Sequence, residues 1–148
     1  MTGRILGLDP GERRIGVALS DPLGIIAQPH SVIDLRSQDL VAELKRIIAE
    51  EDVITIVIGL PVSLDGQERA AAQRARQFAA SVAAATGMEP VFADERFTTS
   101  VAEAALLEGN VRRADRRDAR DKVAAAVMLQ GYLDRLGYQN QESGDDVS

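Results

Sequence analysis

The sequence predicts an α/β fold in which a β-hairpin precedes strands that are connected by helices. Residues 5–21 (ILGLDPGERRIGVALSD) form two apolar runs around an Asp-Pro-Gly turn, which is typical of paired strands. Residues 53–58 (VITIVI) are a continuous β-branched run, the pattern of a strand that is covered on both faces in a parallel sheet. Two strand–helix–strand connections should be right-handed crossovers, which makes the strands they join parallel.

The other elements follow in chain order. Residues 24–33 contain Pro29 and fit a loop followed by an irregular strand at the edge of the sheet. Residues 39–51 carry apolar side chains at helical spacing, and the alanine-rich stretch 67–86 is a helix that Gly87 ends. The remaining elements are a short strand at 90–93, a short helix from Ser100 to Gly109, and a last helix at 115–136.

Length and composition favour one soluble domain. A chain of 148 residues can form one full core, so we expect a single domain over 1–138 and a disordered acidic tail over 139–148. The longest apolar runs are too short to span a membrane, and the N-terminus does not resemble a signal peptide, so we expect a cytoplasmic protein.

Composition also excludes several kinds of site. The sequence has no cysteine and one histidine, His30, which excludes disulfides, Cys-based zinc sites and His-cluster metal sites. The net charge of −6 argues against broad non-specific binding of nucleic acid, although a local basic patch can override a global balance.

Acidic residues follow the strands that should end at one edge of the sheet. Asp9 ends the first strand, and Asp94 and Glu95 follow the strand at 90–93. Ligands of such sheets gather at the carboxyl ends of the parallel strands. Asp21 ends the second strand, which is antiparallel to the first, so it belongs at the opposite edge. Strand alternation does not decide between Asp94 and Glu95, because neighbours face opposite sides.

The start of the last helix is the densest basic region of the chain. It carries Asp118 and Asp121, which lie three residues apart and therefore on one helix face. Carboxylates that bind a divalent metal, surrounded by arginines that bind backbone phosphates, suit a metal-dependent phosphodiesterase. The basic side chains are Arg112, Arg113, Arg116, Arg117, Arg120 and Lys122.

Each acidic segment alone also fits a structural role. Asp9 could cap its turn, Asp94-Glu95-Arg96 could form an ion pair at a strand end, and the helix acids could pair with neighbouring arginines. The functional interpretation depends on the combination, because three separate segments each deliver an acid to one region.

Four segments together resemble the YqgF/RuvX family: GLDPGERRIGVALSD, VIGLPVSLDG, DERFTT and DKVAAAVMLQGYL. They occur in the order of the family and cover the chain from about Ile5 to Tyr132. Members are described as pre-16S rRNA nucleases and as Holliday-junction resolvases. The resemblance implies an RNase H-like fold, with a mixed five-stranded sheet and helices on both faces. It also implies hydrolysis of phosphodiester bonds that depends on a divalent metal.

The resemblance assigns the catalytic and metal-binding carboxylates to Asp9, Glu95 and Asp121, with Asp118 as a further candidate. It implies Mg²⁺ or Mn²⁺ as cofactor, and in a two-metal site the ions lie ~4 Å apart. The chain departs from the family at Arg120, where a valine is frequent before the helix acid. Predicted phosphate contacts are Arg13, Arg96, Arg112, Arg113, Arg116, Arg117 and Arg120.

The substrate and the function class stay open at this point. The same fold serves processing of pre-rRNA and cleavage of branched DNA, and no residue identifiably reads the RNA 2′-hydroxyl. Resolution of a symmetric DNA junction needs two active sites and hence a homodimer. An ATP-binding protein of the actin or sugar-kinase type needs two such lobes, and 148 residues supply one. A non-catalytic ribosome-assembly module is the third class, and the presence of all three acids favours activity instead.

Overall fold

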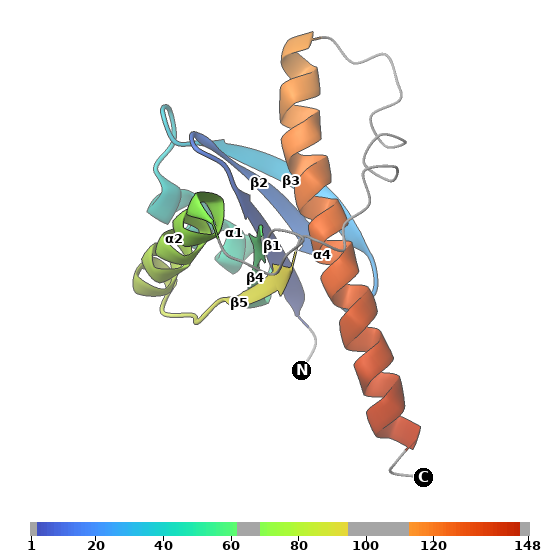
Figure 1. Cartoon of the computed structure of the whole chain (residues 1–148). Coiled ribbons are helices and arrows are strands. Elements are labelled where there is room, and N and C mark those ends of the chain that lie inside the picture. The colour runs from blue at the N-terminus through green and yellow to red at the C-terminus, as the bar shows by residue number, and fades with distance from the viewer. Residues whose placement is uncertain (1–2, 62–68, 95–112, 146–148) are drawn as a thin grey trace.

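The computed structural model describes residues 3–61, 69–94 and 113–145, apart from the side chains of 113–118 and 138–145. Figure 1 shows a twisted sheet with two helices on one side and the long last helix across the other. The elements are β1 (Arg4–Pro10), β2 (Arg14–Ser20), β3 (Ala27–Asp34), α1 (Leu40–Glu50), β4 (Val53–Leu60), α2 (Ala70–Thr86), β5 (Val91–Asp94) and α4 (Arg113–Asp145).

The sheet has five strands in the order β3-β2-β1-β4-β5. β1 and β2 are antiparallel, as are β2 and β3, whereas β4 pairs in parallel with β1 and with β5. The predicted hairpin, the edge position of the third strand and the parallel crossovers are therefore confirmed. The carboxyl ends of β1, β4 and β5 lie at one edge, as the sequence indicated.

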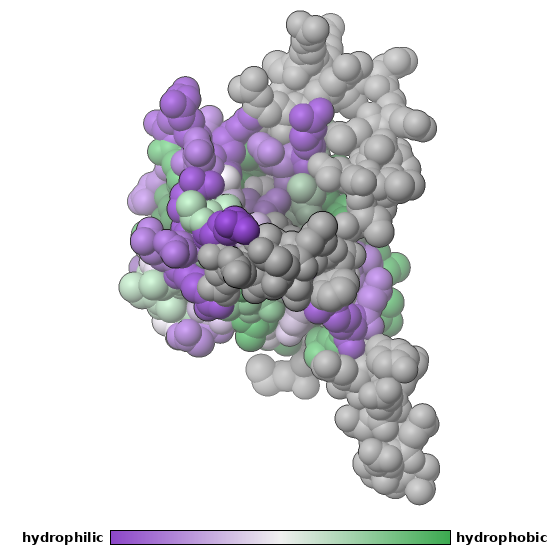
Figure 2. All heavy atoms as spheres, viewed as in Figure 1, coloured by the Kyte–Doolittle hydropathy of each residue, from purple (hydrophilic) through white to green (hydrophobic). Residues whose placement is uncertain are grey.

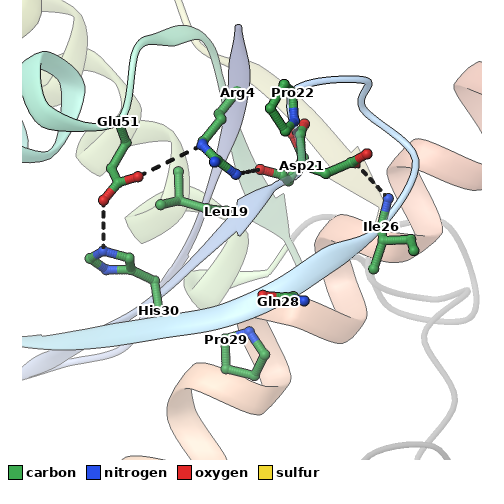
Figure 3. Close-up of a pocket in the computed structure, with 10 residues that line it drawn as sticks. Arg4, Leu19, Asp21, Pro22, Ile26, Gln28, Pro29, His30 and Glu51 are labelled. Atoms are coloured by element: carbon green, nitrogen blue, oxygen red, sulfur yellow. Dashed lines mark hydrogen bonds and ion pairs between the residues drawn. The ribbon is translucent and has the colours of Figure 1, made fainter.

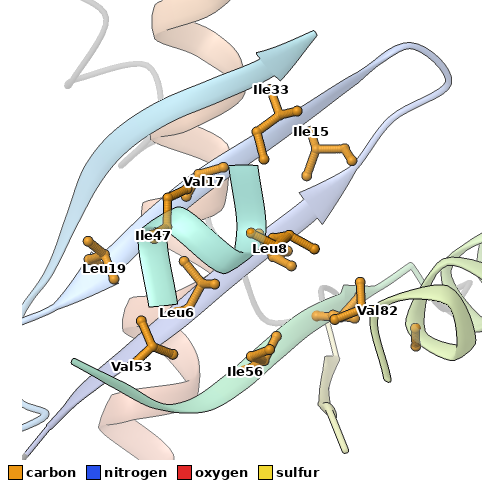
Figure 4. Packing of buried hydrophobic residues seen from close by; sticks show 13 residues of the cluster. Leu6, Leu8, Ile15, Val17, Leu19, Ile33, Ile47, Val53, Ile56 and Val82 are labelled. Atoms are coloured by element: carbon orange, nitrogen blue, oxygen red, sulfur yellow. The ribbon is translucent and has the colours of Figure 1, made fainter. Parts of the chain in front are cut away.

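The two faces of the sheet carry separate hydrophobic layers, because successive side chains of a strand point to opposite sides. In β1, Leu6 and Leu8 face α1 and α2, where they pack in one buried cluster with Ile47 and Val82 (Figure 4). Ile5 belongs to the other cluster, which α4 covers. Alternation therefore assigns each strand residue near the candidate site to one of the two layers.

Local chemistry sets the helix ends. The Oδ1 of Asp39 accepts a hydrogen bond from the backbone N of Val41 at 3.2 Å and caps α1. Gly87 ends α2 in the left-handed conformation, with φ of 73°, which a glycine adopts without strain. Within the described ranges, no helix has the length and apolar character needed to cross a membrane.

Three expectations need correction. The second helix begins at Ala70 rather than at 67, and the last helix is longer at both ends than 115–136. β4 is not covered on both faces along its whole length, because Ile54 near its start is 45% exposed. The short helix expected from Ser100 to Gly109 lies outside the described residues.

Candidate metal site

The strand register places Asp9 on the face of the sheet that α4 covers. Asp9 lies directly opposite Gly16 in the β1–β2 pair, and side chains of directly paired residues project from the same face. A Cβ atom on Gly16 would overlap the backbone oxygen of Asp121 and lie 2.8 Å from its carbonyl carbon. α4 therefore packs against the backbone of β2 at Asp121, on the face from which Asp9 projects.

The close approach of α4 depends on Gly16, because any larger residue would push the helix away. A Cβ on Gly16 would also lie 3.3 Å from the Cβ of Ala125, one helical turn beyond Asp121. Two small residues thus allow the backbone of α4 to lie against the sheet at Asp121. The sequence analysis missed this role, although the small residue between Ile15 and Val17 was its visible signal.

Arg14 joins the hairpin to Asp121. Its Nε lies 3.4 Å from Oδ2 of Asp121, and the two side chains are 21% and 32% exposed. Arg14 is two residues before Gly16, so it projects from the same face and is a diagonal neighbour of Asp9. The sequence analysis assigned no role to Arg14. The ion pair could not be found from spacing, because it joins residues far apart in the chain.

An open pocket of about 330 Å³ lies at this edge of the sheet. It is lined by residues of the hairpin turn and α4: Gly11, Glu12, Arg13, Arg14 and Asp121. The turn is held by a hydrogen bond from the N of Gly11 to the O of Arg14 at 2.9 Å, and Glu12 pairs with Arg74 of α2 at 3.6 Å. Hydrophilic side chains gather at the end of the molecule where this turn and the described start of α4 lie (Figure 2).

The structure brings some of the predicted site residues together and leaves others undescribed. Asp9 and Asp121 share one face, Arg13 lines the pocket, and Arg120 is exposed one residue before Asp121. Glu95, Arg96 and Arg112 lie outside the described residues, and only the backbone is described for Arg113, Arg116, Arg117 and Asp118.

Asp94, the alternative to Glu95, faces away from this site. Ala93 belongs to the layer under α4, whereas Phe92 packs against the layers that α1 and α2 cover. Asp94 follows Ala93, so alternation directs its side chain to the side of Phe92. Asp94 is therefore on the opposite face from Asp9, which removes it as a partner of Asp9 and Asp121.

The donor chemistry of Asp9 and Asp121 fits a hard divalent cation. Mg²⁺ and Mn²⁺ prefer oxygen ligands. Asp9 projects from the face of the sheet that α4 covers, and Asp121 lies on α4 where the helix backbone meets that face. Among the residues that the structure describes, no group of three or more His, Cys, Asp or Glu side chains is close enough to hold a metal. The third predicted ligand, Glu95, is outside that set.

Asp21 lies at the opposite edge of the sheet, as predicted, and its role there is structural. Its Oδ1 accepts hydrogen bonds from the backbone N of Ile26 at 2.9 Å and of Ile25 at 2.7 Å. These bonds hold the pKa of the Asp21 carboxyl below its ordinary value, because they stabilise the charged form. Asp21 borders a separate pocket of about 440 Å³, where Glu51 pairs with Arg4 and His30 (Figure 3).

Comparison with known proteins gives consistent sequence relatives. The family model for RuvX, described as a Holliday junction resolvase, matches residues 3–135. A protein of Symbiobacterium thermophilum named "Putative pre-16S rRNA nuclease" is 46% identical over 142 residues, covering 95% of this chain and 98% of the relative. A protein of Dictyoglomus turgidum with the same name is 43% identical over 134 residues, covering 90% of this chain and 95% of the relative.

Solved structures agree with the fold. RuvC of T. thermophilus in complex with a Holliday junction substrate aligns with a TM-score of 0.54 at 14% identity, over 91% of this chain and 96% of that chain. A second structure of Thermus thermophilus RuvC aligns with a TM-score of 0.52 at 13% identity, over 90% of this chain and 96% of that chain. Together with the strand order, this likeness confirms the predicted RNase H-like fold.

Proposed function

This chain belongs to the RuvX family, and from that membership and the geometry of Asp9 and Asp121 we propose that it is a divalent-metal-dependent nuclease. The observation that carries the proposal is the packing of Gly16 against Asp121, since Gly16 is the strand partner of Asp9. Residues more than a hundred positions apart thereby lie on the same face of the sheet, which supports the proposal that their carboxylates share one ion. Convergence of this kind is what a metal site requires and what separate turn caps or helix ion pairs would not need.

Asp9, Glu95 and Asp121 would hold Mg²⁺ or Mn²⁺ in the proposed site. The bound ion would supply polarisation of the scissile phosphate and a more acidic bound water. The protein itself contributes the geometry: β1 fixes Asp9, and Gly16 fixes the depth at which α4 presents Asp121. Arg13 in the pocket and Arg120 beside Asp121 are the proposed contacts to backbone phosphates.

We propose pre-16S rRNA as the substrate, cleaved during maturation of its 5′ end in the cytoplasm. The names of the relatives support this choice, at identities of 43% and 46% over most of the chain. The alternative substrate is a four-way DNA junction, which the family description and the RuvC neighbours favour. That alternative requires a homodimer, because two strands must be cut symmetrically.

Side-by-side cleavage assays distinguish the two substrates. A pre-16S rRNA fragment and a four-way DNA junction are incubated with the protein and Mn²⁺, and products are separated on denaturing gels. We expect cleavage of the RNA by the wild type, and none by Asp9→Asn. Asp21→Asn is the matched control, since it removes a carboxylate at the opposite edge of the sheet, and it should cleave like the wild type.

The outcomes separate the function classes. Cleavage of the junction alone would favour the resolvase. Binding of RNA without metal-dependent cleavage of either substrate would favour a non-catalytic assembly module. An Asp9→Asn protein that cleaves at the wild-type rate would refute the proposed site.

A further inference from the structure

A guanidinium group lies beside Asp121, one of the carboxylates that we propose as metal ligands. Arg14 Nε is 3.4 Å from Oδ2 of Asp121, and both residues line the same pocket. Arg14 also projects from the same face as Asp9, its diagonal neighbour across the β1–β2 pair. Diagonal neighbours of an antiparallel pair are about 7–8 Å apart, within reach of a long side chain. A positive charge thus lies beside Asp121 and on the same face of the sheet as Asp9, the two residues that we assign to metal binding.

The position of Arg14 has an electrostatic consequence. Two carboxylates that share one region repel each other, and a guanidinium within about 4 Å of either offsets that repulsion. A divalent cation held by Asp121 would meet this positive charge. It would either break the ion pair with Arg14 or bind beside an uncompensated cation. Both cases make metal binding weaker than the carboxylates alone would give.

We propose that Arg14 is a built-in counter-ion that competes with the divalent metal for Asp121. The inference rests on the proposed function, and it adds a regulation of the same site. Arg14 keeps the charge near Asp121 balanced before metal arrives and lowers the affinity for metal. Arg14 acts on the metal through Asp121, so it is a positioning residue and not a ligand.

A purely structural role for Arg14 predicts the opposite sign. If the ion pair only held Asp121 in place, its loss would leave the carboxylate less ordered and would weaken metal binding. If Arg14 competes with the metal, its loss strengthens metal binding. The sign of the change therefore separates the two roles, independently of any cleavage activity.

The test measures Mn²⁺ binding to metal-free protein by electron paramagnetic resonance of free Mn²⁺. Arg14→Gln should bind Mn²⁺ about two- to fivefold more tightly than the wild type, the range that a partly exposed ion pair supports. Arg14→Lys keeps the charge and should bind like the wild type. Arg13→Gln is the matched control, because Arg13 lines the same pocket from the same turn. It should change the affinity less than Arg14→Gln does.

Folding is checked by circular dichroism before each titration. Arg14→Met serves as a second uncharged variant, because it keeps an apolar stem where Arg14 is partly buried. It should also bind Mn²⁺ more tightly. If both uncharged variants bind Mn²⁺ no more tightly than Arg13→Gln, the inference is wrong while the proposed function stands. If the wild type binds no Mn²⁺, both the inference and the proposed metal site are wrong.

Discussion

Replacement of Gly16 by alanine tests whether the packing of α4 positions the site. The new Cβ would lie 2.8 Å from the carbonyl carbon of Asp121 and would overlap its oxygen. Ordinary contacts begin at 3.4 Å, so the carbonyl carbon alone requires a shift of about 0.6 Å, and relief at the oxygen requires more. Both atoms belong to the helix backbone, so no side chain can turn away. α4 must therefore move from β2 by about 1 Å at Asp121.

Two effects follow from this displacement. Overpacking of this kind costs about 1–3 kcal/mol in the free energy of unfolding. A misplacement of about 1 Å at a catalytic group can lower the rate by about 10²-fold. We expect Gly16→Ala to be folded, somewhat less stable in urea denaturation, and slower by about that factor in the cleavage of its nucleic acid substrate.

Gly7→Ala is the matched control for Gly16→Ala. Its new Cβ would lie 3.0 Å from the Cβ of Leu129, on the same face of the sheet but two turns of α4 beyond Asp121. A milder strain on helix packing, directed at a side chain of α4, is thus applied away from the site. We expect Gly7→Ala to lose stability with a smaller loss of cleavage. Wild-type cleavage by Gly16→Ala would refute the reasoning, as would equal losses in the two variants.

Three further predictions concern the site and the core. Asp121→Asn should abolish metal-dependent cleavage while leaving the circular dichroism spectrum unchanged; a cleaving variant would contradict the assignment. The pKa of Asp21 is lower in the folded protein than its ordinary value of 3.8, so the charged carboxylate stabilises the fold. This stabilisation is complete above pH 3.8 and is lost progressively as the pH falls below it. When the pH is lowered from 6 to about 3, the free energy of unfolding measured in urea should therefore fall less for Asp21→Asn than for the wild type. Leu129→Ala should cost about 2–5 kcal/mol in the free energy of unfolding, because the Leu129 side chain of α4 is fully buried against the sheet, and a cost below about 1 kcal/mol would contradict that packing.

The sequence predicted those parts of the fold whose signals are local. The hairpin, the β-branched run of β4 and the stop at Gly87 each depend on a few neighbouring residues, and all three are confirmed. The bend of the hairpin was placed too early, because Asp9 and Pro10 pair with β2 and the turn begins at Gly11. The length of α4 was underestimated, because the polar residues after Gln139 carry no apolar periodicity from which a helix is recognised. The exposure of Ile54 was missed because a β-branched run does not show which residue lies beyond the covering helices.

The candidate site was predictable only in part, because it depends on contacts between distant segments. Topology placed Asp9 and Asp21 at opposite edges of the sheet, and the register agrees. The contact of Gly16 with α4 and the pairing of Arg14 with Asp121 depend on how the helix crosses the sheet, which no spacing encodes. The face from which Asp94 projects follows from the hydrophobic layer to which its neighbour Ala93 belongs. That layer could not be assigned from the sequence alone.

A crystal structure with Mn²⁺, read by its anomalous scattering, tests the central claim most directly. The account predicts a bound ion coordinated by carboxylate oxygens of both Asp9 and Asp121, at about 2.0–2.2 Å as expected for a small divalent cation. An ion bound elsewhere, or held by one of these residues without the other, would contradict the proposal that the hairpin and α4 together form a metal site.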